Sequence, residues 1–335
     1  NASNSWSGTT TIADGRIELK TNDNPLPTGT ELTISGDGML ITWGEVDQTV
    51  AKLVSSSANA IIRVNEGHTQ STAVTYNSSF GKLTVNQSAN TTFAGKITGR
   101  GGLVKSGSGN LTLSGANTYY GGTTINAGSI ILGAAGVLSD VGEVVLANTS
   151  GATLNLNNNN EQIGALAGGG ASGGNVVLGS GNLIINPTWN KFRSSRGSTF
   201  TGVISGSGSV TKTGEGILKF AGENTYTGGT VINEGSLRAM VTNAIAVNRA
   251  LTLSSTGKFV VHDSKTVTVG SFIGSGNTIL HIRPSAIFNV DQSTDTTMSG
   301  TIHGFGVGGN KGKLRKTGDG TLTISGTTNV TVISY

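Results

Sequence analysis

The sequence has no cysteine among its 335 residues, which excludes a disulfide framework, a thiolate metal site and a cysteine nucleophile. Charged residues make up only 12% and aromatic residues 5%, too little for two ordinary globular domains with large packed cores. A hydrophobic share of 35% and a formal net charge of only +4 nevertheless argue against disorder. The chain is therefore expected to fold around small side chains, as its 53 glycines also indicate.

Long apolar runs and basic runs are missing as well. No stretch approaches the roughly 20 apolar residues of a membrane-spanning helix, so no transmembrane segment is expected. Most of the 22 Lys and Arg residues are scattered singly, which argues against nucleic acid as a partner. The chain opens at Asn1 without an initiator methionine or a signal sequence, so it reads as an exported mature chain or an excised fragment.

What the sequence does contain is internal repetition. The segment that begins at Phe93 aligns without a gap to the segment that begins at Phe200, at an offset of 107 residues. The first half of the same motif recurs around Lys316, and the second half recurs around Trp6. The residues common to the two full copies are Lys105, Asn117, Tyr119, Gly121, Gly122, Ile125, Asn126 and Gly128, which recur as Lys212, Asn224, Tyr226, Gly228, Gly229, Ile232, Asn233 and Gly235. Self-similarity at a fixed period is typical of repeat architectures.

Within each copy, apolar and polar residues alternate with period two, which predicts short strands with one dry face. Ser-Gly, Asn-Ala-Gly and Thr-Gly-Asp-Gly segments bound these runs and supply turns. The residues predicted to point inward are Leu111, Leu113, Leu218, Phe220, Leu322 and Ile324, whereas Thr112, Lys219 and Thr323 are predicted to face water. No window shows helical spacing of apolar residues.

Stacked self-similar modules favour a solenoid over an antiparallel sandwich. We therefore predict an all-β fold, a right-handed parallel β-helix with coils of about 20 residues, built from three modules of roughly 110 residues. Residues 1–335 would form one continuous solenoid, with modules at about 4–116, 117–223 and 224–329 and a C-terminal strand at 330–335.

The motif from Lys105 through Tyr119 to Gly128, with its second copy from Lys212 to Gly235, resembles the autotransporter-associated β-strand repeat of bacterial passenger domains. The run from Gln162 to Gly170 is similar to the linker coils of that family. The resemblance implies a right-handed β-helix exported to a bacterial surface, which serves as a stalk, an adhesin or a secretion-assisting scaffold.

Residues that could carry chemistry are sparse, and we expect no catalytic, cofactor-binding or metal-binding site. Asp291 and Asp295 are the closest acidic pair in a strand-like stretch, but the polar residues between them indicate a solvated loop. The four histidines are dispersed in sequence, at His68, His262, His281 and His303. The recurrent lysines are expected at solvated turns, and the recurrent tyrosines are expected to cover Gly-Gly corners rather than stack on sugars.

These observations leave three hypotheses for function. The first is a non-catalytic extracellular structural protein that stacks head to tail into a filament. The second is a fragment of an autotransporter passenger that acts as a surface adhesin or stalk, with a host or surface glycan or protein as partner. The third, a polysaccharide-active enzyme, lacks the clustered carboxylates that such chemistry requires.

The filament hypothesis rests on where the chain interrupts the repeat. The sequence ends with the first half of the motif and begins with the second half, so the two halves are complementary. A solenoid end exposes unpaired backbone groups, which a second copy can cover. The residues expected at this self-association joint are Trp6, Ile12, Ile17, Leu322, Ile324, Val330, Val332 and Tyr335. Separately, the inserted run from Phe305 to Asn310 is expected to form a loop that contacts partners.

Overall fold

The computed structural model describes residues 4–20, 24–66, 80–187 and 197–334. Across these residues the regular structure consists of β-strands and one 3-10 turn, η1 (Gly308–Asn310), with no α-helix. All strand pairings that link these strands are parallel, as in β12 (Leu111–Leu113) beside β14 (Ser129–Leu132). The predicted all-β fold, a parallel β-helix, is therefore confirmed.

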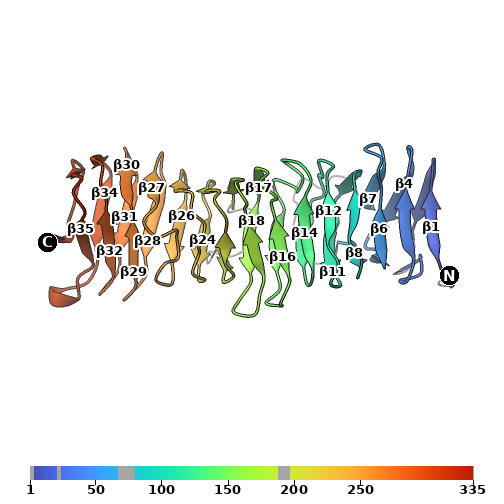
Figure 1. Ribbon diagram of the computed structural model, residues 1–335, viewed down its shortest axis with the longest axis horizontal. Helices are drawn as coiled ribbons and strands as arrows, with labels where there is room; N and C mark the ends of the chain where they lie inside the picture. Colours follow the sequence, from blue (N-terminus) through green and yellow to red (C-terminus); the bar gives the residue numbers. More distant parts are fainter. Residues whose placement is uncertain (1–3, 21–23, 67–79, 188–196, 335) are drawn as a thin grey trace. The chain divides into compact units, whose positions relative to one another are not determined.

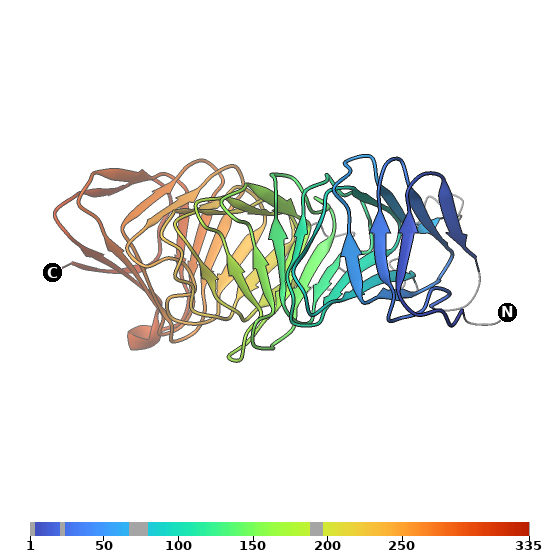
Figure 2. The same ribbon diagram turned by 45° about the vertical axis from the view of Figure 1, so that its right-hand side comes forward.

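The chain divides into two compact units. Unit 1 comprises Asn1–Gly164 with Ser172–Asn175, and unit 2 comprises Ala165–Ala171 with Val176–Tyr335. Figure 1 shows the strands of each unit stacked in chain order, and Figure 2 shows the coils of unit 1 wound around a common interior. The division into three modules and the boundaries within them stay predictions.

The described strands of unit 1 up to β16 form four stacks of parallel strands, in which each strand pairs with the strand one coil later. The first stack contains β1 (Thr9–Ile12), β3 (Glu31–Ile34) and β6 (Lys52–Val54). The second contains β2 (Arg16–Leu19), β4 (Met39–Trp43), β7 (Ile61–Glu66) and β10 (Lys96–Gly99). The third contains β5 (Gln48–Val50), β8 (Lys82–Asn86), β11 (Gly102–Ser106), β13 (Thr123–Ile125) and β15 (Glu143–Leu146). The fourth contains β9 (Thr91–Phe93), β12, β14 and β16 (Thr153–Asn155), and β17 (Glu161–Ile163) follows in the chain.

Unit 2 has the same construction. Its longest stack contains β18 (Ala165–Gly168), β21 (Ser198–Phe200), β24 (Ile217–Phe220), β26 (Ser236–Ala239), β28 (Lys258–Val261), β31 (Ile279–Ile282) and β34 (Thr301–Gly304). A second contains β20 (Leu183–Ile185), β23 (Val210–Lys212), β25 (Thr230–Ile232), β27 (Ala250–Leu253), β30 (Ser271–Gly274), β33 (Thr296–Met298) and β36 (Leu322–Ile324). The remaining strands are β29 (Thr266–Val269), β32 (Ile287–Asp291), β35 (Lys313–Thr317) and β37 (Thr331–Ser334), and β22 (Ile204–Ser205) beside β19 (Asn175–Val177).

The pairing register gives the length of a coil. Leu111 pairs with Ile130, 19 residues later, and Phe259 pairs with Leu280, 21 residues later. The coil of about 20 residues that the sequence predicts is therefore present in both units. Successive coils lie one strand spacing apart, about 4.8 Å, so equivalent side chains form ladders along each stack.

The core of each unit is the interior of its coils. Leu111, Leu113, Leu218 and Phe220 are fully buried, as the alternation predicts, whereas Leu322 and Ile324 are half-buried. In unit 2 the ring of Phe288 packs edge-on against Phe259 and Phe272, with ring centres 6.0 and 5.0 Å apart. No described segment forms a helix long and apolar enough to cross a membrane.

Candidate functional site

The recurrent lysines of the motif lie inside the coils, so the expectation of solvated turns is wrong. The Nζ of Lys212 donates to the main-chain oxygens of Thr213 at 2.6 Å, Gly214 at 2.6 Å and Glu234 at 3.1 Å. Lys105 is equally buried and donates to Ser106, Gly107 and Ala127. An ammonium carries three donors on a long apolar stem, so it can pack in the interior while it satisfies converging carbonyls at the turn.

Burial lowers the pKa of these ammonium groups. Desolvation lowers the pKa of Lys105 to about 8 and that of Lys212 to about 7. The third copy, Lys316, is only half-buried and donates to Thr317 and Gly318. Because each lysine is bound to main-chain oxygens of its own turn, and Lys105 and Lys212 also to the next coil, the three do not form a ligand site.

The recurrent asparagines connect three successive coils. Asn224 Oδ1 accepts from the main-chain nitrogen of Ile204 at 2.7 Å, and its Nδ2 donates to the oxygen of Ala244 at 2.6 Å. Asn117 bonds in the same way to the coils before and after it. Both side chains are buried, so their role in the motif is to fix the register between neighbouring coils.

The recurrent tyrosines are also interior. Tyr119 and Tyr226 are 0% and 2% exposed, and their hydroxyls form hydrogen bonds of 2.5 Å with Thr123 and Thr230. Their rings are therefore out of reach of a sugar. Trp6 takes the same place in the N-terminal half-motif, where its Nε1 donates to Thr10 at 3.2 Å and the residue is 43% exposed.

The two aspartates considered as catalytic candidates are exposed, and each forms a hydrogen bond with a different residue. Asp291 Oδ1 accepts from the hydroxyl of Thr317 at 2.9 Å, and Asp295 Oδ1 accepts from the main-chain nitrogen of Thr321 at 2.7 Å. Each thus caps the next coil, and no paired general acid and base results. Among the described residues, no group of three or more His, Cys, Asp and Glu side chains could hold a metal ion.

Two histidines that are dispersed in the sequence meet in the structure. His281 and His303 pair across adjacent strands with ring centres 5.4 Å apart. Their spacing of 22 residues, one coil, is the sequence signal that could have placed them together. His68 lies outside the described residues.

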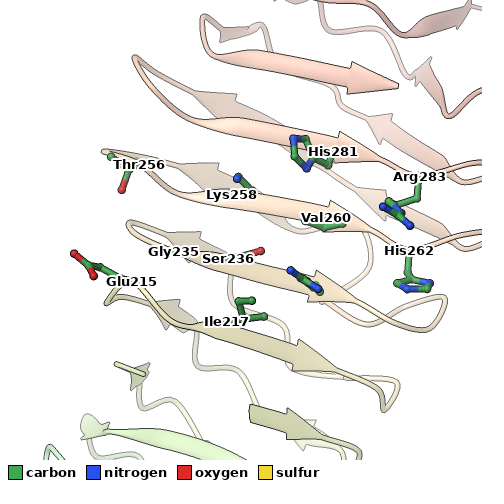
Figure 3. Close-up of a pocket in the computed structure, with 11 residues that line it drawn as sticks. Glu215, Ile217, Gly235, Ser236, Thr256, Lys258, Val260, His262, His281 and Arg283 are labelled. Atoms are coloured by element: carbon green, nitrogen blue, oxygen red, sulfur yellow. The ribbon is translucent and has the colours of Figure 1, made fainter. Parts of the chain in front are cut away.

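A groove of about 550 Å³ lies on the outward face of β24, β26, β28 and β31, all within unit 2. Figure 3 shows Glu215 and Thr256 at one end of these strands and His262 and Arg283 at the other. We call this feature the basic groove, because its ionisable lining is dominated by cations and histidines. That lining comprises Arg238, Lys258, His262, His281, Arg283 and one acid, Glu215.

The register explains why these side chains gather. Arg238 pairs with Val260, and Val260 pairs with His281, so these residues form one outward ladder. Lys258 stands beside it, two residues before Val260 and on the same face. Burial, followed by the positive charges nearby, of which Lys258 is the largest contributor, lowers the pKa of His281 to about 4. Its imidazole is therefore neutral at physiological pH.

An aromatic ring flanks the basic groove. Phe305 packs against His281 at 4.9 Å between ring centres, and the guanidinium of Arg283 lies 5.9 Å from the Phe305 ring. Phe305 is 38% exposed, and Val307 in the same loop is 85% exposed. The sequence singled out this inserted loop, but it gave no indication that the loop adjoins a row of cations.

The residues predicted for self-association differ in exposure. Ile12 is buried, and Ile17, Leu322, Ile324 and Val330 are half-buried. Trp6 and Val332 are 43% and 55% exposed, and Tyr335 lies outside the described residues.

Comparison with protein-family models gives a match to the passenger-associated transport repeat. The matched segments are residues 1–19, 103–132, 210–239 and 314–331. They cover the two full motifs and the two terminal half-motifs, so the resemblance noted in the sequence is confirmed.

Among curated proteins, the chain is similar to the adhesin BmaC autotransporter of Brucella suis biovar 1 (strain 1330). The two are 39% identical over 159 residues, which is 47% of this chain and 4% of the relative. The chain therefore spans a small part of the length of that protein. No solved structure matches.

Proposed function

The chain carries the transport repeat of autotransporter passengers, and from this premise we propose that it is a non-catalytic β-solenoid displayed outside a bacterial cell, as part of a surface adhesin or its stalk. The observation that carries the proposal is the match of the repeat at four segments spread along the chain. The 39% identity to an adhesin supports the same role.

The use of the motif residues supports a scaffold role. Lys212, Asn224 and Tyr226 are buried and bonded within the coils, so these motif residues hold the coils together rather than present reactive groups. The separate engagement of Asp291 and Asp295 supports the absence of a catalytic role. In this proposal, function resides in outward ladders and in loops such as that of Phe305.

Two measurements test the proposal. Antibodies raised against the purified chain should label intact cells of the bacterium that makes the parent protein, and external protease should remove the label. Beads coated with the folded chain should adhere to cultured host cells more than beads coated with the heat-unfolded chain. Label found only after cell lysis would contradict the proposed location, and equal adhesion of both beads would contradict an adhesive role for this segment.

Head-to-tail self-association is a second proposal, supported by the edges of two strands. Within the described residues, β1 pairs only with β3, and β37 pairs only with β35. An unpaired edge offers main-chain groups to another strand. The intact chain should then sediment as oligomers at high concentration, and removal of residues 330–335 should leave folded monomers. Monomers from the intact chain would refute stacking.

A further inference from the structure

We infer that the basic groove of unit 2 binds an anionic glycan, a polysaccharide that carries carboxylate or sulfate groups on hydroxylated sugar rings. The inference rests on the proposed surface role for its biological setting and names the class of partner that this role would serve. The groove itself stands on four observations, which concern charge, unpartnered donors, shape and ring chemistry.

The first observation is uncompensated positive charge. Among the ion pairs of the described residues, none includes Arg238 or Lys258, although both line the groove. Arg283 pairs with Asp263 at 3.2 Å at the margin, where both side chains are about half exposed. Charge-assisted hydrogen bonds to carboxylate or sulfate oxygens are the interactions that such cations form most strongly.

The second observation is a pair of donors without partners. Ser236 is 8% exposed, and its Oγ is buried with no hydrogen-bond partner. The Nε of Arg238, two residues later on the same strand face, is likewise buried and unpartnered. Buried polar atoms normally have partners, because an unsatisfied group costs about 1–3 kcal/mol. Both residues line the groove, so a ligand with several acceptor oxygens would satisfy them once the Arg238 side chain shifts to admit it.

The third observation is shape. A volume of about 550 Å³ lies in the range of roughly 300–1,000 Å³ typical of small-molecule sites. The groove crosses four strands that lie about 4.8 Å apart, so it runs along the coil axis and presents a repeating row of side chains. A linear polymer with regularly spaced acids matches such a row better than a compact metabolite does.

The fourth observation distinguishes a glycan from other polyanions. Neutral His281 can both donate and accept hydrogen bonds, which suits sugar hydroxyls. Phe305 beside it offers one ring face and edge to an apolar sugar face. Single-stranded nucleic acid is bound by several aromatic rings on which bases stack in succession, and this groove has one.

The test uses the full chain and three oligosaccharide probes in calorimetry at about 0.15 M salt, where surface attraction is screened beyond roughly 8 Å. The probes are a heparin hexasaccharide, which carries sulfate and carboxylate, a hexagalacturonate, which carries carboxylate alone, and neutral maltohexaose. We expect binding of at least one acidic probe and none of maltohexaose. The two acidic probes distinguish sulfate from carboxylate as the recognised group.

Arg238→Gln and Lys258→Gln should each weaken the acidic probe about tenfold, the loss expected for one charge-assisted contact. The matched control is Lys96→Gln, which removes the same charge from an exposed position on β10 in unit 1 and should leave affinity unchanged. Phe305→Ala should weaken binding without changing its salt dependence. Circular dichroism verifies that each variant is folded.

Three results would overturn the inference: no binding of either acidic probe, equal weakening by Lys96→Gln, or tighter binding of a 12-nucleotide single-stranded DNA at the same residues. None of these results bears on whether antibodies label the cell surface. Failure of the groove and failure of the proposed surface location are therefore distinguishable.

Discussion

The ammonium of Lys212 donates to the main-chain oxygen of Glu234, 22 residues further along the chain, at a distance of 3.1 Å. A lysine of one coil thus caps a carbonyl of the next coil, in addition to two carbonyls of its own turn. Lys105 makes the equivalent bond to Ala127 at 3.2 Å. These bonds tie neighbouring coils together at the corner where no strand pairing does so.

Lys212→Met should destabilise unit 2 by about 1–3 kcal/mol, because the methionine keeps an apolar stem but leaves three partly buried carbonyls without their lysine donor. Urea denaturation followed by circular dichroism measures the change. Lys219→Met, on the outward face of β24, is the matched control and should cost less than about 0.5 kcal/mol. Equal costs would mean that the three hydrogen bonds of Lys212 make no net contribution to the free energy of unfolding.

The pH dependence of stability should carry the signature of the same lysine. Desolvation lowers the pKa of Lys212 to about 7 in the folded state, whereas an unfolded lysine titrates near 10.5. Between these values the unfolded chain binds more protons than the folded chain. The free energy of unfolding should therefore rise as pH increases from about 7 to 10.5. Melting temperatures across this range should show a shallower rise in Lys212→Met than in the parent chain.

Titration of a buried glutamate in unit 1 should make stability change with pH in the opposite direction. Glu161 accepts from the main-chain nitrogens of Val137 and Leu138, yet burial raises its pKa to about 7 from 4.5. The folded state therefore binds more protons between these values, and the stabilisation present below pH 4.5 should be lost as pH rises through 7. Glu161→Gln should flatten this decline, whereas Glu45→Gln, at an exposed position, should preserve it. Unchanged profiles in both variants would contradict the assignment.

The two faces of β24 should respond differently to truncation. Leu218 is fully buried, so Leu218→Ala should cost about 2–5 kcal/mol through lost burial and a cavity. Lys219→Ala, one residue later on the outward face, should cost less than about 0.5 kcal/mol. Equal sensitivity of the denaturation midpoint at both positions would contradict the face that alternation assigns to them.

Local alternation was enough to predict the buried positions in β12 and β24, because a strand sends successive side chains to opposite faces. The same rule places Lys212 on the inward face with Val210, so the sequence contained the signal for the buried lysine. The expectation that lysine seeks water overrode that signal. Lysine is in fact tolerated inside where several carbonyls converge on its ammonium, an arrangement that depends on the following coil.

The basic groove could not be predicted from local pattern. Arg238, Lys258 and His281 come from three successive coils, and only the pairing register puts them on one face. A shift of one residue in any strand would turn its side chains to the other side. The coil length of about 20 residues limits the possible pairing registers between successive strands. Corners of variable length still prevent an exact assignment of the register without the structure.

The side chain of Asn224 also limits how the chain can change in length during evolution. It bonds to Ile204 and Ala244, each 20 residues away in opposite directions. An insertion or deletion between Asn224 and either residue would therefore have to bulge out of the coil if the bond is to be kept. By contrast, the excursion after Phe305 is closed at its base by a bond of 2.8 Å from the nitrogen of Gly312 to the oxygen of Phe305. Residues within that excursion can be added or removed without moving β35, so relatives should diversify there while their corners at the asparagines keep a fixed count.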